Sequence, residues 1–250
     1  MKQNSWHKTM YDKWFASTTL NSEQLLKSAV TESHFILNQT SLKIGSHILD
    51  VPCGTGRHAI QFAKLGHYVT AIDISKDCIN IAKKGNAHKS IRYDSGDMVN
   101  LSKYKGKFDL VTNLFSSFGY FSTDKENENV LKEMHHALKP GGQICIFNIN
   151  RDWLMTIFSK NDWRETPQEF ILHDRKFDPI TKFSEARMIV INKKSGKRKE
   201  YFHRMRLYSK AEMVTLMRKI GFKRIEVFGN NSGEKFSKLK STHPFYFGIK

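Results

Sequence analysis

Largely apolar segments alternate with amphipathic stretches over the first 150 residues. Short segments of this kind are HILDV (47–51), YVTAIDI (68–74), FDLVTNL (108–114) and QICIFNI (143–149), and a further one lies at 91–93. Apolar runs without alternation are typical of strands buried on both faces, as in parallel sheets. Helical patterns lie between them, at 57–66, 75–84 and 123–138. This order predicts an α/β fold with a doubly wound, mostly parallel sheet covered by helices.

The pattern changes after Asn150. The segments 169–177, 181–192 and 199–208 alternate or are β-branched, and short turn-like stretches join them. They predict an antiparallel β-meander inserted before a last helix, which covers 209–220 and ends at Gly221. Two closing strands, at 223–229 and 244–250, are expected to complete the sheet at an antiparallel edge. An early helix is expected to begin after Asn21 or Ser22.

Composition supports one large domain with an insertion. The chain has 250 residues, 39% of them hydrophobic and 12% aromatic, which is enough for a sizeable core. No apolar run approaches the roughly 20 residues of a membrane span, and the first residues lack the apolar stretch of a secretory signal, so a cytosolic protein is expected. Three cysteines without CxxC spacing indicate buried thiols and neither disulfides nor a metal site.

The chain is strongly basic, with a formal net charge of +17, and most of the excess lies after residue 150. Such a charge suits a polyanionic partner, but a lysine-rich solvated surface gives the same count. Charge alone therefore does not select a function.

The most informative motif is Asp50-Val-Pro-Cys-Gly-Thr-Gly56, between the first strand and a helix. Glycines at the carboxyl end of a parallel strand let a ligand approach the backbone, and the helix N-terminus favours an anionic group. Asp73 ends the second strand, where its carboxylate can accept hydrogen bonds from both hydroxyls of a ribose. A nucleotide-like cofactor is expected, and Gly54-x-Gly56-x-x-Ala59 by itself also fits NAD.

Three features argue against NAD. Asp50 would crowd a pyrophosphate but could hold an ammonium group. Gly96-Asp97-Met98 follows the third strand, where a carboxylate can accept a hydrogen bond from an adenine amino group. LKPGG precedes the fifth strand, and PFYFGIK ends the chain as an expected antiparallel strand. With these residues the sequence, over 44–150, resembles the class I S-adenosylmethionine-dependent methyltransferases.

The resemblance implies a seven-stranded Rossmann-like sheet with one antiparallel strand, and S-adenosyl-L-methionine as cofactor. Pro52 departs from the family's glycine-rich loop, because glycine is frequent at that position. Carried over position by position, the residues that the resemblance assigns to the cofactor are Asp50, Cys53, Gly54, Gly56, Arg57, Asp73, Ile74, Asp97, Met98, Asn113 and Leu114.

The insertion and the segment from His203 to Phe222 are similar in layout to small-molecule methyltransferases, such as the glycine and sugar N-methyltransferases. This similarity implies that Tyr11 and Trp14 close over the cofactor as a lid. It places five side chains toward the substrate, with His203 and Tyr120 as the candidate bases and Phe118, Arg151 and Arg206 beside them.

The expected organisation has four parts. Residues 1–43 form the N-terminal aromatic segment and helix, 44–150 the cofactor-binding core, 151–208 the insertion on the substrate side, and 209–250 the last helix with the closing strands.

The function that follows is methyl transfer to a nitrogen or oxygen of a small molecule. Such a reaction requires positioning, exclusion of water and an unprotonated nucleophile. One alternative keeps the cofactor and makes RNA the acceptor, bound by the basic and aromatic segment 192–206. Another is a cofactor-binding module without turnover. The oligomeric state stays open.

Overall fold

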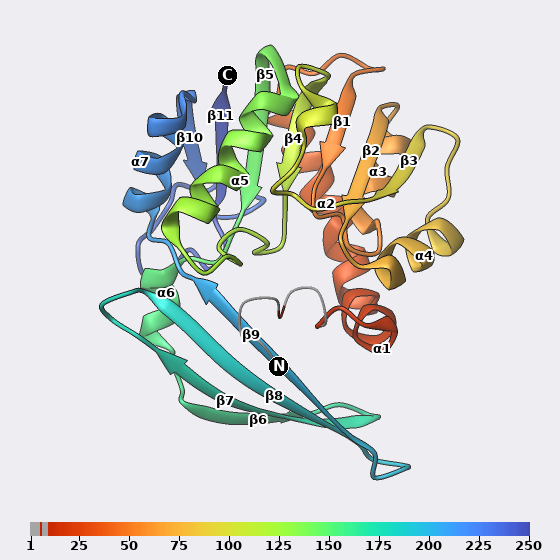
Figure 1. Ribbon diagram of the computed structural model, residues 1–250, viewed down its shortest axis with the longest axis vertical. Coiled ribbons are helices and arrows are strands. Elements are labelled where there is room, and N and C mark those ends of the chain that lie inside the picture. The colour runs from red at the N-terminus through yellow and green to blue at the C-terminus, as the bar shows by residue number, and fades with distance from the viewer. Residues whose placement is uncertain (1–5, 7–9) are drawn as a thin grey trace.

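The computed structural model describes Trp6 and residues 10–250, and it places a seven-stranded sheet above a separate four-stranded sheet (Figure 1). The strand order of the larger sheet is β10-β11-β5-β4-β1-β2-β3. Its strands are β1 (His47–Asp50), β2 (Tyr68–Asp73), β3 (Ile91–Ser95), β4 (Phe108–Asn113), β5 (Leu138–Phe147), β10 (Lys223–Phe228) and β11 (Phe245–Ile249). Only β11 runs against both of its neighbours. The predicted doubly wound sheet with one antiparallel strand is confirmed.

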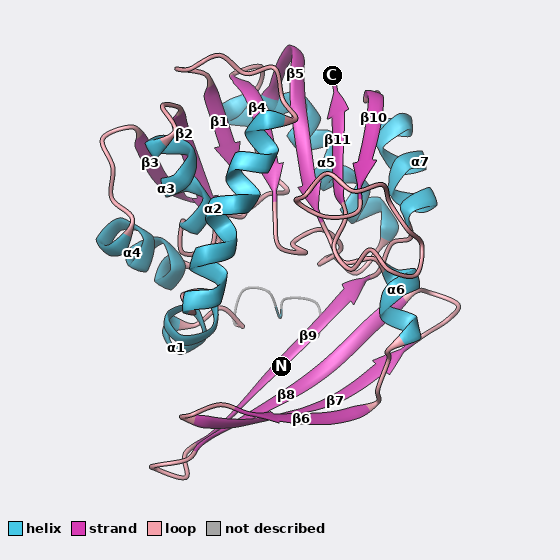
Figure 2. Ribbon diagram, turned by 180° about the vertical axis from the view of Figure 1, so that it is seen from behind, coloured by secondary structure: helices cyan, strands magenta, loops and turns pink. Residues whose placement is uncertain are grey.

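Helices cover both faces of the larger sheet. Helices α2 and α3 lie in front of the sheet in Figure 2, whereas α5 and α7 lie in front of it in Figure 1. The helical elements are α1 (Lys13–Phe15), a π-helical turn (Ala16–Leu20), α2 (Glu23–Asn38), α3 (Arg57–Lys64), α4 (Lys76–Gly85), a 3₁₀ turn (Ser102–Tyr104), α5 (Asp124–Ala137), α6 (Arg151–Thr156) and α7 (Lys210–Ile220). Helices α5 and α7 each begin with a capping box, Thr123 with Glu126 and Ser209 with Glu212.

The four-stranded sheet is the predicted antiparallel insertion. Its order is β6-β7-β8-β9, made of β6 (Asn161–Glu165), β7 (Glu169–Phe177), β8 (Phe183–Asn192) and β9 (Arg198–Arg206). Three of these strands were expected from their alternation. The first one, β6, was not, because Asn-Asp-Trp-Arg-Glu contains a single apolar residue and all five side chains are exposed.

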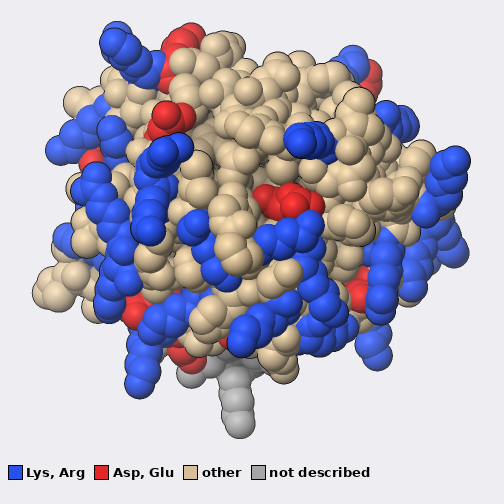
Figure 3. Space-filling model, turned by 90° about the horizontal axis from the view of Figure 1, so that it is seen from above, with Lys and Arg blue, Asp and Glu red and all other residues tan. Residues whose placement is uncertain are grey.

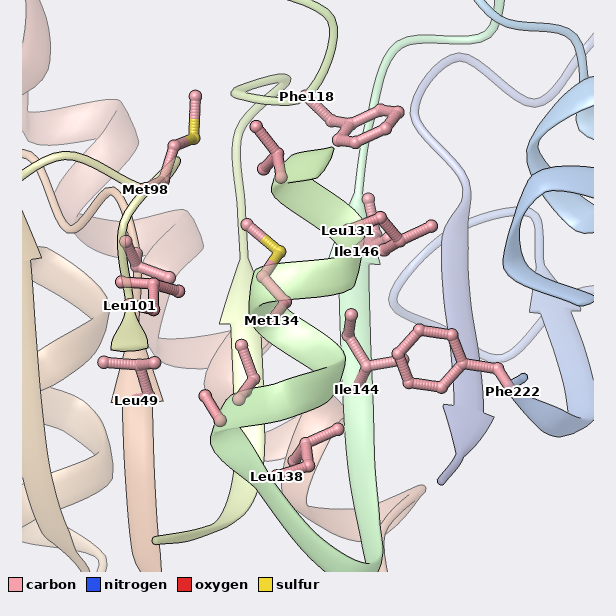
Figure 4. Packing of buried hydrophobic residues seen from close by; sticks show 14 of the residues in the cluster. Leu49, Met98, Leu101, Phe118, Leu131, Met134, Leu138, Ile144, Ile146 and Phe222 are labelled. Atoms are coloured by element: carbon pink, nitrogen blue, oxygen red, sulfur yellow. The ribbon is translucent and has the colours of Figure 1, made fainter. Parts of the chain in front are cut away.

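The core is built from the apolar runs that predicted the strands. Between the sheet and α5, buried residues such as Leu131, Met134, Ile144 and Ile146 pack together, and Phe118 closes the cluster at its upper end (Figure 4). A second cluster on the opposite face joins α2, α3 and α4 to the sheet. Burial on both faces explains why these strands are apolar throughout.

Candidate active site

A cavity of about 250 Å³ lies at the carboxyl ends of the parallel strands, between the larger sheet, the N-terminal segment and β9. This is the edge at which ligands bind in open α/β sheets. Three groups of residues form the wall. The core contributes Val51, Pro52, Cys53, Gly54, Arg57, His58, Asp73, Ile74, Cys78, Gly96, Asp97, Met98, Leu114, Phe115, Ser116, Ser117 and Tyr120. The N-terminal segment contributes Trp6, Met10, Tyr11, Phe15, Thr19 and Leu20, and β9 contributes His203 and Met205.

The glycine loop between β1 and α3 is tight. Gly56 caps α3 in a left-handed conformation, with φ +78°, and a Cβ atom there would lie 2.5 Å from the hydroxyl oxygen of Tyr93. Glycine is therefore required at this position both by the backbone and by the space. Gly54, two residues earlier, lies on the cavity wall.

Asp73 connects this loop to the second strand. Its carboxylate accepts hydrogen bonds from the backbone N–H groups of Gly54 and Ser75, both at 2.8 Å. Burial raises the pKa of Asp73 to about 6, although the backbone hydrogen bonds counteract part of that effect. Each carboxylate oxygen has two lone pairs, so both retain capacity for a ligand hydroxyl.

Asp50 and Arg57 carry buried polar atoms beside the loop. The hydroxyl of Thr112 donates to one carboxylate oxygen of Asp50 at 2.8 Å, and the other oxygen has no partner among the described residues. Burial raises the pKa of Asp50 to about 7. The guanidinium of Arg57 lies 4.4 Å from the ring centre of Phe115, and its Nε also has no partner in the described part of the chain. Buried polar atoms of this kind are rare in folded proteins and are expected where a ligand supplies the missing partner.

Asp97 and Met98 follow β3 and reach the cavity from the far side. Asp97 accepts a hydrogen bond from the backbone N–H of Val99 at 3.2 Å, which fixes the turn. Asn113 is fully buried, and its side-chain amide donates a hydrogen bond to the carbonyl oxygen of Val51 at 2.9 Å. The next residue, Leu114, is on the wall.

The N-terminal segment closes one side of the cavity. The hydroxyls of Tyr11 and Tyr120 share a hydrogen bond of 2.6 Å, and the hydroxyl of Ser75 donates to the carbonyl oxygen of Tyr11 at 2.7 Å. The edge of Trp6 meets Tyr120, with ring centres 4.8 Å apart. Burial raises the pKa of both tyrosines, so both hydroxyls stay protonated at neutral pH.

His203 faces the cavity from β9, with its ring 5.9 Å from that of Trp6. Burial, followed by the charge of Arg175, lowers the pKa of His203 to about 4. The imidazole is therefore neutral near pH 7, and it is a weak base.

Four cofactor candidates lie outside the wall. Asp50 and Asn113 support the loop and strand ends from below, and Gly56 shapes the loop. Trp14 stacks on Tyr201, with ring centres 5.7 Å apart, and so joins the N-terminal segment to β9. The other nine candidates, Tyr11 among them, line the cavity together.

The three substrate candidates expected beside His203 and Tyr120 lie outside the cavity wall. Phe118 is completely buried in the core next to Tyr208. Arg151 forms an ion pair with Glu212 at 2.5 Å. Arg206 is buried between Asp124, at 3.1 Å, and the same Glu212, at 2.8 Å. All three therefore serve packing or the junction between the insertion and α7.

Several wall residues were not foreseen, notably Trp6, Phe15, Phe115 and Met205. Alternation along β9 would have identified Met205, because it lies two residues from His203 and so points to the same face. The aromatic residues near the N-terminus gave no comparable signal, since their position depends on how the segment folds back.

No helix of the described residues is long and apolar enough to cross a membrane. Within the same residues, no group of three or more His, Cys, Asp and Glu side chains is arranged to hold a metal ion.

Comparison with known sequences gives a family match and several relatives. A family model described as a methyltransferase domain matches residues 48–142. The putative methyltransferase YqeM of Bacillus subtilis is 25% identical over 189 residues, which cover 74% of this chain and 76% of that protein. The ubiquinone biosynthesis O-methyltransferase of Coxiella burnetii is 30% identical over 127 residues, 50% of this chain and 52% of that protein. The chain thus spans only about half the length of this second relative.

Solved structures share the fold over nearly the whole chain. The CcbJ methyltransferase from Streptomyces caelestis has a TM-score of 0.81 at 17% identity and covers 97% of both chains. An S-adenosylmethionine-dependent methyltransferase from Clostridium acetobutylicum has a TM-score of 0.78 at 17% identity, over 91% of this chain and 95% of that one. The sugar N-methyltransferase KedS8 from Streptoalloteichus has a TM-score of 0.61 at 15% identity, over 95% and 90%. The likeness includes the four-stranded insertion, since the covered share leaves little of either chain out.

Proposed function

We propose that this chain transfers the methyl group of S-adenosyl-L-methionine to a small-molecule acceptor. The match of residues 48–142 to a family model described as a methyltransferase domain supports the proposal. The observation that carries the proposal is the position of Asp73. Its carboxylate ends β2, is held by the backbone of the glycine loop at Gly54, and faces the same cavity as Asp97 and Met98. A ribose, an amino-acid moiety and an adenine can each find a partner along this wall.

The residues present fit this cofactor. Asp73 would accept hydrogen bonds from the ribose hydroxyls, and Asp97 with Met98 would border the adenine. Arg57 lines the cavity, and its unpartnered Nε offers a donor that would match a carboxylate group. Asp50 lies behind the wall, and its unpartnered carboxylate oxygen would hold an ammonium group through water. S-Adenosyl-L-methionine is the cofactor, and when bound it supplies an electrophilic methyl group on a positively charged sulfur.

The remaining wall receives the acceptor. His203 and Met205 from β9 line the cavity together with Trp6, Tyr11 and Tyr120, so this part is mostly aromatic. The chain's contribution to the rate is to orient the acceptor and exclude water, because a direct displacement requires alignment above all.

The protonation states favour a nitrogen acceptor over an oxygen acceptor. Tyr120 has a raised pKa, so it remains protonated and can only donate or share its hydrogen bond at neutral pH. His203, with a pKa of about 4, accepts a hydrogen bond but removes a proton from an alcohol poorly. A neutral amine already presents a lone pair and loses its proton after transfer. The predicted bases thus become hydrogen-bonding residues in this proposal.

The RNA alternative has less support. Lys and Arg side chains are scattered across the face shown in Figure 3, with uncharged surface between them. In the segment 192–206, five of the seven basic side chains form ion pairs with acidic ones, and the five are Lys193, Arg198, Lys199, Arg204 and Arg206. Paired groups offer little net charge to a phosphate backbone. The cytosolic location stays a prediction.

The direct test is calorimetric titration of the protein with S-adenosylmethionine, S-adenosylhomocysteine and NAD. Both adenosyl ligands are expected to bind, Asp73→Ala to weaken them strongly, and the control Asp77→Asn, four residues on and outside the cavity, to leave them unchanged. Binding of NAD alone, or unaltered binding by Asp73→Ala, would contradict the proposal. Incubation with methyl-labelled cofactor and fractionated cell metabolites then identifies the acceptor, and its modified atom decides between nitrogen and oxygen.

A further inference from the structure

Strand β6 leaves one edge of the four-stranded sheet uncovered. Its five residues, 161–165, are all exposed, and it pairs with β7 on one side only. Both views place it at the border of the sheet that is farthest from the larger sheet, whereas β9 faces the cavity (Figures 1 and 2). An uncovered edge strand is a template for pairing with another strand.

The hydrogen bonds at the two ends of β6 show which of its backbone groups are free to pair. Arg175 N–H donates to the carbonyl oxygen of Lys160 at 2.7 Å, and Thr166 N–H donates to that of Glu169 at 2.8 Å. In an antiparallel ladder the residues that bond to a given neighbour alternate, so the even-numbered positions 160–166 point their backbone groups toward β7. The odd-numbered positions 161, 163 and 165 therefore point theirs outward. The carbonyl oxygen of Asn161 already accepts a hydrogen bond from the hydroxyl of Ser159 at 2.7 Å and keeps one lone pair for a further partner.

An apolar patch lies beside this edge on the outer face of the sheet. Trp163 is 66% exposed. Leu172, directly opposite on β7, and Phe170, which pairs with Glu165, are exposed as well. The rings of Trp163 and Phe170 are 6.3 Å apart. Adjacent exposed apolar side chains of this size are typical of interaction surfaces.

We propose that β6 pairs antiparallel with β6 of a second copy of this chain, about a twofold axis at Trp163. With the axis there, residue 163 of one copy faces residue 163 of the other, and 161 faces 165. All three outward-pointing positions are then hydrogen-bonded on both strands. The two apolar patches meet across the axis and form one continuous strip.

The charges of the side chains on β6 favour the same position of the twofold axis. A twofold at Trp163 sets Asp162 of each copy opposite Arg164 of the other, and such directly opposed side chains of unlike charge stabilise a pair of strands. An axis at position 162 would instead set Asp162 against itself, and one at 164 would set Arg164 against itself. Asp162 already contacts His173 and Arg175 within the chain, whereas Arg164 has no acidic partner among the described residues. The second copy supplies that partner.

Cysteine cross-linking tests the register. The three native cysteines are buried, so a new thiol on β6 is the exposed one within the described chain. Trp163→Cys places two thiols across the axis and is expected to form an intermolecular disulfide at least about tenfold faster than Glu165→Cys, whose two copies would lie too far apart. A mixture of Asn161→Cys and Glu165→Cys is expected to cross-link to each other and not to themselves.

Analytical ultracentrifugation of the uncross-linked protein tests the dimer itself. The wild-type chain is expected to sediment as a dimer, and Arg164→Glu to raise the dissociation constant at least about 100-fold, because it opposes two carboxylates on each side of the axis. Lys197→Glu makes the same charge change in the β8–β9 turn and is expected to leave the dimer intact. A monomeric wild type, a dimer indifferent to Arg164→Glu, or equal cross-linking of Trp163→Cys and Glu165→Cys would each overturn the proposal. None of these residues lines the cavity, so methyl transfer is expected to survive in every variant.

Discussion

Gly119 joins the strand-end loop after β4 to β9, and replacing it with alanine should disturb that junction. Its φ is +108°, its carbonyl oxygen accepts a hydrogen bond of 2.7 Å from the N–H of Arg206, and a Cβ atom would lie 2.3 Å from the carbonyl oxygen of Arg206. Both partners in this contact are backbone, so neither can rotate away. Tyr120 follows Gly119, and His203 lies on β9 three residues before Arg206, so the contact sets the separation of two wall residues.

The expected loss of stability rests on two free-energy contributions and on a steric overlap. The methyl group requires a displacement of about 1 Å to reach ordinary van der Waals distance, and a backbone held at positive φ costs a non-glycine residue about 1–3 kcal/mol. Weakening the buried backbone hydrogen bond adds about 1 kcal/mol. Gly119→Ala is therefore expected to lower the free energy of unfolding by about 3 kcal/mol. Because β9 moves away, water reaches His203 and its pKa rises from about 4 toward the ordinary value.

Chemical denaturation measures the free energy of unfolding, and the histidine Cε1–H resonances measured against pH give the pKa. The matched control is Gly141→Ala, since Gly141 also has a positive φ, of +76°, but has open space where the Cβ atom would lie. The control is expected to lose only about 1 kcal/mol and to leave the pKa of His203 unchanged. Equal losses in the two variants, or an unmoved His203, would show that the contact between Gly119 and Arg206 does not position β9.

Three further predictions concern the cavity and its surroundings. Since the pKa of Asp73 is raised to about 6, its carboxylate protonates below that pH, and the affinity for S-adenosylhomocysteine measured by calorimetry should fall there by up to about tenfold per pH unit. Asp73→Asn should remove this pH dependence. A pH profile that Asp73→Asn leaves unchanged would contradict the role of Asp73. Tyr11→Phe removes the 2.6 Å hydrogen bond to Tyr120 and should lower the affinity for the same ligand by up to about tenfold. The control Tyr68→Phe, at an exposed tyrosine, should leave the affinity unchanged. A gain in affinity in Tyr11→Phe would contradict a stabilising role of this hydrogen bond. Phe118→Ala should lower the free energy of unfolding by about 3–5 kcal/mol in denaturant titrations, while the ligand affinity stays within a factor of two. A large loss of affinity with little loss of stability would show that Phe118 contacts the ligand.

The part of the cavity wall that we propose for the cofactor could be located from the sequence, because the topology of the sheet brings its residues together. The residues after β1, β2 and β3 come together wherever parallel strands end side by side, so Gly54, Asp73 and Asp97 needed no knowledge of packing. The strands themselves were recognisable because burial on both faces makes them apolar.

The acceptor half depended on details that the sequence shows only weakly. His203 and Arg206 are three residues apart on one strand, so they point to opposite faces, and only His203 reaches the cavity. Applying the alternation to this strand would have separated them. Arg151 and Trp14 are different, because their partners Glu212 and Tyr201 are distant in the chain and their pairing follows from the tertiary fold.

Two adjacent residues of the N-terminal segment, Tyr11 and Asp12, form hydrogen bonds with different parts of the molecule. Tyr11 contacts Tyr120 and Ser75 of the larger sheet's side, while Asp12 accepts hydrogen bonds from Lys199, at 3.1 Å, and from Tyr201 on β9. Because one peptide bond joins the two residues, a ligand that displaces Tyr11 is expected to disturb the contacts of Asp12 with β9 as well. The two substrates should consequently bind with heterotropic cooperativity, and by thermodynamic reciprocity each must alter the other's affinity by the same factor.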